Sequence, residues 1–533
     1  MKNLPIVKHF GTGLLLGTVA GAVTGIVITL YKFCVKHIIH LSEAGYAFLR
    51  ENPLWLIAVV IGLPGLACLF AFIYHRVTNL RGGGIPTAIG LLRGWLPFRW
   101  VRNVVGIFGL SLTTFLIGVP LGTEGPSVQL GTALGKGCSA LWGRRGEAWS
   151  RYGMTGGACA GFSTATGAPI SGILFAVEEA HHRVSPLILL VAIAAVSAAR
   201  LVSDLLAPVL GVSSNLFPNL ELKPLIGANC WIPLVLGGIF GLFAVAFLSC
   251  YRYVTDLVNH KLAKVADVYK IYVVLLLTVG MGLVSFSFIS TGHDLVLALF
   301  EGETVWMLLL LLLVRTVLTM GANTTNITGG IFLPILAIGA TLSALFGECV
   351  VALGVDAALY PTILVLGVTA CIAGMMKMPL TAVAFAVEAL SGHQIMLPIL
   401  LTTAVSYGVA ELFGAVSIND RVLDNRMEQV HKGRTRTTAE TIVTVQPDSF
   451  AEGKEIRDIL WPDGLFVLAV DKSRALGGKT LHAGDRLQVR YSTFHEKRLH
   501  NELAAIVGSQ QEKSPQQEPA ATVGAQHESQ TTG

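Results

Sequence analysis

GTEGPSVQLG, from Gly122 to Gly131, places a single acid in the middle of a long apolar segment. Between Arg102 and Lys136 the only charged side chain is that of Glu124. A carboxylate at the centre of a bilayer costs about 2.5–3.5 kcal/mol on insertion scales. The glycines and the proline around it predict that a new helix starts here. An acid in such a position indicates a functional site.

The composition of the chain is that of a protein embedded in a membrane. Of its 533 residues, 53% are hydrophobic and only 13% are charged, against about 25% charged in soluble proteins. About eleven apolar stretches are long enough to cross or enter a bilayer. The first is followed closely by Lys32 and Lys36 and reads as a membrane span, not as a cleaved signal peptide. Basic and aromatic residues are not interleaved, so nucleic acid is not an expected partner.

The apolar region repeats itself. GTEGPSVQLG at 122 and GIFLPILAIG at 330 share the pattern GxxxPxxxxG, and the string FAVE occurs at 175 and again at 385. The two offsets, 208 and 210 residues, are nearly equal and predict two related halves, about 10–215 and 230–426. Repeats with broken helices are a common transporter plan, in which the binding site lies where the breaks meet. The spacing alone leaves open whether the halves are inverted.

Three breaks of glycine and proline interrupt the apolar sequence: GGGIP (82–86), GTEGP (122–126) and TGGIFLP (328–334). Each predicts a helix N-terminus, whose backbone N–H groups are unpaired donors with partial positive charge. Three such ends aimed at one point would bind an anion without lysine or arginine, and weakly enough to release it. We therefore expect no buried basic side chain at the site. Helix packing through small residues is the alternative for any single break.

The acids near these breaks suggest proton chemistry. The Glu124 carboxylate can occupy an anion site when no ion does, and a proton lets it leave, which makes it a gate, a proton carrier or both. Glu178 and Glu179 end a second uncharged run, 152–177. Neighbouring helical positions point about 100° apart, so at most one of the two faces inward. A solvated helix end and a proton entry point are both open for this pair.

These motifs resemble those of the CLC family of chloride channels and chloride/proton antiporters, over about residues 10–426. GTEGPSVQLG is similar to the family's G(K/R)EGP signature, GGIFLP to its GxFxP and GGGIP to its GSGIP. The resemblance implies an all-α polytopic membrane protein with two inverted repeats of tilted, broken helices. It also implies a homodimer with one anion pathway per subunit, in a cell inner (plasma) membrane, with both termini in the cytoplasm. It implies no cofactor and no metal.

The resemblance assigns roles to individual residues. Glu124 matches the external gating glutamate, and Glu179 matches the internal proton glutamate that the family's antiporters keep. Three positions depart from the family's pattern: Gly83 stands for its central serine, Asn419 for its helix-terminal tyrosine, and Thr123 for a lysine or arginine. Loss of the two hydroxyls predicts a weaker central anion site. The expected anion-binding residues are Gly83, Thr123, Gly125, Gly330, Ile331, Phe332 and Asn419.

The resemblance leaves a choice of transport mode. Exchange of chloride, or a related small anion, for protons is the leading hypothesis, and Glu179 favours it. A gated chloride channel without proton coupling and a relative that prefers fluoride or nitrate are the alternatives. An intramembrane enzyme is disfavoured because HExxH and GxSxG motifs are absent from the sequence.

The sequence changes character after Gly414. A short polar helix is predicted at SINDRVLDNRMEQ and closes a membrane domain of residues 1–432. Residues 433–507 hold alternating runs, TIVTVQP, LFVLAV and RLQVRY, with turns at PDG (462–464) and AGD (483–485), which predict a small α/β cytoplasmic domain. This segment resembles the RCK C-terminal (TrkA-C-like) domain, which implies a regulatory module that dimerises or binds a small ligand. Residues 508–533 are predicted to be a disordered tail.

Overall fold

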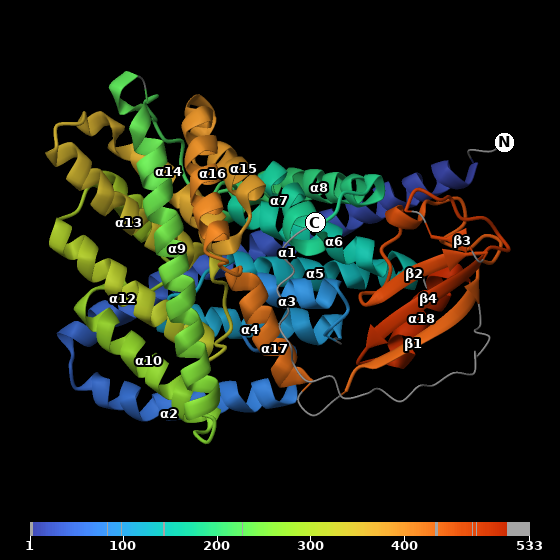
Figure 1. The fold of residues 1–533 in the computed structure, drawn as a ribbon. Coiled ribbons are helices and arrows are strands. Elements are labelled where there is room, and N and C mark those ends of the chain that lie inside the picture. The colour runs from blue at the N-terminus through green and yellow to red at the C-terminus, as the bar shows by residue number, and fades with distance from the viewer. Residues whose placement is uncertain are drawn as a thin grey trace. The chain divides into compact units, whose positions relative to one another are not determined.

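The computed structural model describes residues 4–82, 84–96, 99–141, 144–225, 227–431, 435–471, 473–475 and 477–508. The chain divides into two compact units, one spanning Val7–Val430 and the other from His431 onward together with Met1–Ile6. The first unit is helical throughout and the second contains the only sheet in the described residues (Figure 1).

The first half of the helical unit contains two long helices followed by a series of shorter ones. Two of these, α3 and α7, are only a few turns long and begin at proline-containing breaks. The elements are α1 (Leu4–Glu51), α2 (Trp55–Arg76), η1 (Thr78–Leu80), α3 (Ile85–Leu92), α4 (Trp100–Ile117), α5 (Glu124–Ala140), α6 (Arg144–Thr166), α7 (Pro169–Phe175), η2 (Ala176–His181) and α8 (Pro186–Leu210).

The second half repeats this order. α5 and α13 begin at residues 124 and 332, and α7 and α15 begin at residues 169 and 379, so the offsets expected from sequence are confirmed. The elements are η3 (Gly227–Trp231), α9 (Ile232–Asp256), η4 (Leu257–Lys261), α10 (Asp267–Val284), η5 (Phe286–Phe288), α11 (His293–Ala298), η6 (Leu299–Glu301), α12 (Val305–Thr324), α13 (Phe332–Ala352), η7 (Ala357–Leu359), α14 (Tyr360–Cys371), η8 (Ile372–Met376), α15 (Pro379–Ala389), η9 (Gly392–Ile395), α16 (Met396–Leu412) and α17 (Ile418–Val430).

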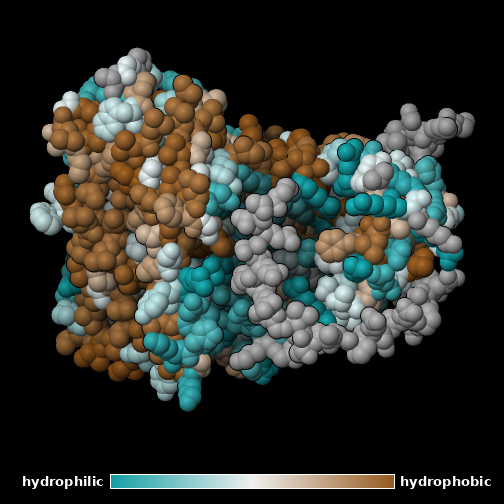
Figure 2. Space-filling model, viewed as in Figure 1, coloured by the Kyte–Doolittle hydropathy of each residue, from teal (hydrophilic) through white to brown (hydrophobic). Residues whose placement is uncertain are grey.

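The expected membrane character is confirmed. In the described residues ten helices are long and apolar enough to cross a membrane, and Pro379–Ala389 is a shorter apolar helix. Figure 2 shows hydrophobic side chains over the surface formed by α9 and α12. Leu242 on α9 and Trp306 and Leu313 on α12 are more than half exposed. Large apolar side chains that face outward suit contact with lipid.

The α5–α6 pair sets the position of the helix that begins at Glu124. The helices pack antiparallel, with Gly131 against Gly157 and Gly135 against Gly153. A Cβ at Gly131 would lie 2.0 Å from the carbonyl oxygen of Gly157, so the backbones approach more closely than any side chain permits.

The two halves are inverted, and a pair of glutamates shows how they meet. Glu388, near the end of α15, turns its carboxylate to the start of α7, where it accepts hydrogen bonds from the backbone N–H groups of Ile170 (2.8 Å) and Ser171 (2.9 Å). These N–H groups have no partner inside their own helix. An acid at a helix N-terminus also complements the helix dipole.

The repeat-related Glu178 makes the reciprocal contact. Its carboxylate accepts hydrogen bonds from the backbone N–H groups of Leu380 (2.9 Å) and Thr381 (2.8 Å) at the start of α15, and from the Thr381 hydroxyl (2.7 Å). An acid at or just after the C-terminal end of each short helix therefore caps the N-terminus of the other. This arrangement requires α7 and α15 to run in opposite directions.

The second unit is a four-stranded antiparallel sheet with one helix. The strands are β1 (Thr437–Thr444), β2 (Leu465–Val470), β3 (Ser473–Arg474) and β4 (Arg486–Thr493), in the order β1-β4-β2-β3, followed by α18 (Glu496–Val507). Val443, Leu487 and Val489 on the sheet and Leu503 on α18 are buried. The small strand-containing C-terminal region is confirmed. The predicted disordered tail falls almost entirely at 509–533, outside the described residues.

The reciprocal caps generate a stability prediction. Glu388→Ala leaves two helix N–H groups without their acceptor, so we expect the free energy of unfolding to fall by about 0.5–2 kcal/mol. Thermal unfolding in detergent measures this as a lower Tm. Asp256→Ala is the matched control, because Asp256 is an exposed acid near a helix end whose ion pair with Arg252 is long, at 3.8 Å. Equal Tm values for Glu388→Ala and wild type would contradict the capping role.

Candidate functional site

The three breaks found in the sequence meet at one place. Gly82 donates its backbone N–H to the carbonyl oxygen of Asn326 (2.6 Å) and accepts from the N–H of Gly329 (2.7 Å). Gly122 and Gly330 exchange two backbone hydrogen bonds of 2.6 and 2.8 Å, the geometry of an isolated antiparallel bridge. The breaks of the first half are therefore held directly to the break of the second half.

Glycines also bring the helix starts into backbone contact. A Cβ on Gly125 would lie 2.6 Å from the Cα of Gly330 and 2.7 Å from the Cα of Gly84. Only residues without a side chain fit at this junction. The starts of α3, α5 and α13 are thereby gathered within contact distance, and α17 packs along α3. Helix N-termini gathered in this way present unpaired N–H groups and partial positive charge to one small volume.

Glu124 begins α5 at this junction and its side chain is fully buried. Its Oε1 atom accepts a hydrogen bond of 3.2 Å from the hydroxyl of Thr123. Its Oε2 atom has no hydrogen-bond partner in the described part of the chain. Such an oxygen costs free energy in an apolar environment unless the group is protonated or moves. The acid therefore has one satisfied and one unsatisfied oxygen beside a cluster of helix N-termini.

Ile331 and Phe332 lie where α13 begins, next to Gly330, and both are buried. The Phe332 ring is clamped between two other rings, with its centroid 5.3 Å from that of Phe162 and 5.4 Å from that of Phe385, in edge-to-face geometry. These contacts tie the start of α13 to α6 and α15. The aromatic contacts of Phe332 consequently fix the position of the helix start, and with it the backbone N–H groups there.

A second buried acid faces the start of α17. Glu179 is 4% exposed and Asn419 is fully buried. The Asn419 Nδ2 amide donates a hydrogen bond of 2.9 Å to Glu179 Oε1. Arg93 fixes the backbone at this point by donating to the carbonyl oxygens of Glu179 (3.3 Å) and Ala180 (3.4 Å). Asn419 was expected to bind the anion. In this structure its amide is instead bonded to Glu179.

The Glu178 and Glu179 side chains diverge, as helical spacing predicts. Glu178 points to the start of α15 and is a helix cap, whereas Glu179 is buried against α17. Glu179 is buried, whereas Glu178 is half-buried at the cap.

The expectation that no basic side chain is buried at the site is wrong. Arg426 is buried close to the first break, where its guanidinium donates to the carbonyl oxygen of Arg81, and Arg315 is buried on α12. Arg315 donates to the carbonyl oxygen of Ser287 at 2.9 Å. Both arginines are thus engaged with backbone carbonyls. The polar SINDRVLDNRMEQ pattern gave no sign that Arg426 would be buried. Gly83, which we expected at the site, lies outside the described residues.

Gln129 is a site residue that the sequence did not reveal. Its Oε1 atom accepts the backbone N–H of Gly84 at 3.0 Å. Its Nε2 amide donates to the carbonyl oxygen of Asn79 (3.0 Å) and to Oδ1 of Asn103 (3.1 Å). Gln129 therefore fixes the backbone of the first break from within α5. The residue lies inside the GTEGPSVQLG motif, but nothing in the motif assigns a partner to its side chain.

In the part of the chain that the structure describes, His, Cys, Asp and Glu side chains form no group of three that could hold a metal ion. The site is a junction of helix starts with the buried acid Glu124, and a second buried acid, Glu179, lies at the start of α17.

Comparison with known proteins places the chain in a family of ion transporters. The sequence profile for the family described as voltage gated chloride channel matches residues 65–411. The H(+)/Cl(-) exchange transporter ClcA of Vibrio parahaemolyticus serotype O3:K6 is 26% identical over 436 residues, which cover 78% of this chain and 90% of that protein. ClcA of Citrobacter koseri is 28% identical over 441 residues, covering 77% of this chain and 88% of that protein.

Solved structures have the same fold. A slow cyanobacterial Cl⁻/H⁺ antiporter matches with a TM-score of 0.70 and 23% identity, over 78% of this chain and 98% of its own. A CLC-type fluoride/proton antiporter matches with a TM-score of 0.60 and 20% identity, over 76% of this chain and 96% of its own. The match of the profile to more than half of the residues, together with this fold, shows that the protein belongs to the CLC, or voltage-gated chloride channel, family.

Proposed function

We propose that this protein exchanges chloride, or a related small anion, for protons across a cell inner membrane, with Glu124 as external gate and Glu179 as internal proton acceptor. The observation that carries the proposal is the fully buried Glu124 carboxylate, which lies at the junction of three helix starts with one oxygen unpartnered. The relatives named as H(+)/Cl(-) exchange transporters support the choice of ions.

In this proposal the anion is held by backbone N–H groups around Thr123, Gly125, Ile331 and Phe332, with Gly83 contributing from the first break. Gly330 belongs to the site through its close backbone approach, because its own N–H is donated to Gly122. Amide donors carry only partial charges, so they bind the ion weakly enough for it to leave. The Glu124 carboxylate competes with the anion for the same donors because both carry a negative charge. Protonation removes that charge, and the side chain then vacates the site and carries a proton with it.

Glu179 receives protons from the other side of the membrane. Its contact with Asn419 supports this role, because a buried acid needs a polar partner in each protonation state. An acid at this position favours an exchanger over a gated chloride channel. A preference for fluoride or nitrate is the remaining alternative, and paired ion-flux measurements in liposomes decide among the three.

The remaining assignments concern assembly and the second unit. We infer a homodimer with one pathway per subunit and both termini in the cytoplasm. The region after His431 is proposed to be an RCK C-terminal (TrkA-C-like) domain at 433–507, supported by its antiparallel sheet and closing helix. Its role is to strengthen the dimer or to bind a small regulatory ligand.

Glu124→Gln tests the gate. The neutral amide cannot compete with an anion as a charge, so anion flux into liposomes should persist and lose its dependence on pH, while proton movement stops. Simultaneous recordings of anion and proton flux measure both effects. Uphill proton pumping by Glu124→Gln would show that Glu124 is not the proton carrier.

Glu179→Gln tests the inner acid. The amide keeps a hydrogen-bonding partner for Asn419 but cannot carry a proton, so proton flux should be lost and anion flux retained. Glu178→Gln is the matched control, since Glu178 caps α15 and should mainly affect Tm. Equal loss of proton flux in the two variants would rule out the distinction between the acids.

Truncation after residue 432 tests the C-terminal unit. Both repeats and all three breaks precede this point, so the shortened protein should remain a dimer and transport anions in liposomes. Size-exclusion chromatography with light scattering gives the mass of the protein, and flux assays give its activity. A monomeric or inactive product would mean that the C-terminal unit is structurally required.

A further inference from the structure

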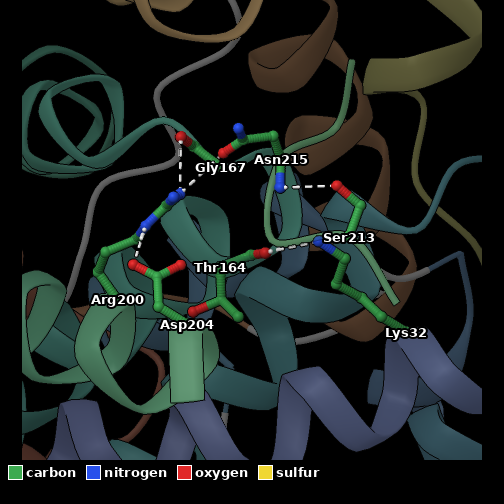
Figure 3. A network of polar contacts seen from close by, with 7 residues as sticks. All are labelled: Lys32, Thr164, Gly167, Arg200, Asp204, Ser213 and Asn215. Carbon is green, nitrogen blue, oxygen red and sulfur yellow. Dashed lines mark hydrogen bonds and ion pairs between the residues drawn. The ribbon is translucent and has the colours of Figure 1, made fainter. Parts of the chain in front are cut away.

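Two cations gather at the C-terminal end of α6, where Figure 3 shows a network of polar contacts. Lys32, on α1, donates its ammonium to the carbonyl oxygen of Thr164 at 3.2 Å. Arg200, on α8, donates to the carbonyl oxygen of Gly167 at 3.3 Å and to Asn215 Oδ1 at 3.1 Å. Basic groups at a helix C-terminus complement its unpaired carbonyls and its dipole.

The two cations differ in their charge balance. Arg200 forms an ion pair with Asp204 at 2.8 Å. Lys32 has no carboxylate within 4.0 Å in the described residues, and its ammonium donates to a neutral carbonyl group. The charge of Lys32 is therefore not cancelled locally and acts on groups at longer range.

Helix register places this charge at the level of Glu124. α5 and α6 meet with Gly135 opposite Gly153, Gly131 opposite Gly157, and the Ser127 carbonyl against Gly161. Each step of four residues along α5 corresponds to four residues back along α6. Continuing this register by four residues places the start of α5, next to Glu124, opposite residues 164–165 of α6. Lys32 is bonded at Thr164 and therefore lies level with the gate.

The electrostatic interactions agree with this register. Charges that act on the Glu124 carboxylate come from His293 at the start of α11 and from Lys32 on α1. Lys32 in turn lies within electrostatic range of Glu124. Thr123, the residue next to the gate, is neutral and donates only a hydroxyl hydrogen bond.

We propose that Lys32 is a positioning residue of the Glu124 gate. Its ammonium supplies a positive charge at the same level along α5 and α6 as the carboxylate and draws anions to that end of the pathway. The inference rests on the proposed function of Glu124 as a gate. It adds that protonation of Glu124 depends on a side chain of α1, which is distant from Glu124 in sequence.

The charge has two consequences. A nearby cation favours the ionised form of a carboxylate, so protonation of the gate requires a lower pH than it would without Lys32. The same cation raises the local concentration of anions at the mouth. Loss of the charge should therefore shift the pH of half-maximal flux upward and raise the external anion concentration needed for half-maximal flux.

Lys32→Gln is the test variant, because glutamine keeps a donor for the Thr164 carbonyl while removing the charge. In liposomes we expect the KM for external chloride to rise about twofold to fivefold and the pH midpoint of flux to rise by about half a unit. Lys32→Arg and the double variant Lys32→Gln/Thr123→Lys should restore both values. Lys36→Gln is the matched control, one helical turn away and bonded to the Gly211 carbonyl at 2.7 Å.

Two backgrounds isolate the effect. His293→Gln removes a second titratable group within electrostatic range of Glu124, and the shift caused by Lys32→Gln should survive in it. In Glu124→Gln the pH shift should vanish, because no carboxylate is left to titrate. Unchanged KM and pH midpoint in Lys32→Gln, or equal changes in Lys36→Gln, would overturn the proposal. Absence of coupled proton flux in the wild-type protein would instead contradict the proposed function, so the two failures are distinguishable.

Discussion

The backbone contact of Gly84, Gly125 and Gly330 is the constraint on which the rest of the structure depends. A buried N–H group without a partner costs about 1–3 kcal/mol, and every helix that starts inside the apolar region brings several of them. Gathering these starts in one place lets a single negative group satisfy donors from several helices. The glycines make that gathering possible because no side chain separates the backbones. A carboxylate and a small anion both fit this description.

The inverted repeat explains how the helix starts are held against one another. The bridge between Gly122 and Gly330 joins the halves at the site, and the reciprocal caps of Glu178 and Glu388 join them at α7 and α15. Because each cap uses the acid of one half and the helix start of the other, neither half completes its own short helix. The repeat is therefore both the source of the symmetry and the reason that the halves depend on each other.

The features that could be predicted from the sequence are those that depend on residues close together in the chain. The three breaks, the offset of the halves and the buried position of Glu124 follow from glycine, proline and a lone charge in apolar surroundings. Gln129 and Arg426 were missed as partners of the site because each binds a segment at least 45 residues away in sequence. Polar side chains that bind distant backbone groups carry no local periodicity. The caps were partly visible, since FAVE recurs, but their direction required the antiparallel arrangement of α7 and α15.

Asn419 shows how a departure from the family pattern acquires meaning from its neighbours. The residue stands where the resemblance expects a tyrosine, but its amide is bonded to Glu179. Its Oδ1 atom is buried without a hydrogen-bond partner in the described part of the chain. An amide has both donors and acceptors, so it can donate to the Glu179 carboxylate and accept from the protonated acid after a small rotation. Under the proposed exchange, the residue that replaces an anion ligand is thus suited to a proton site, and the loss of a hydroxyl from the anion pathway is matched by a partner for the inner acid.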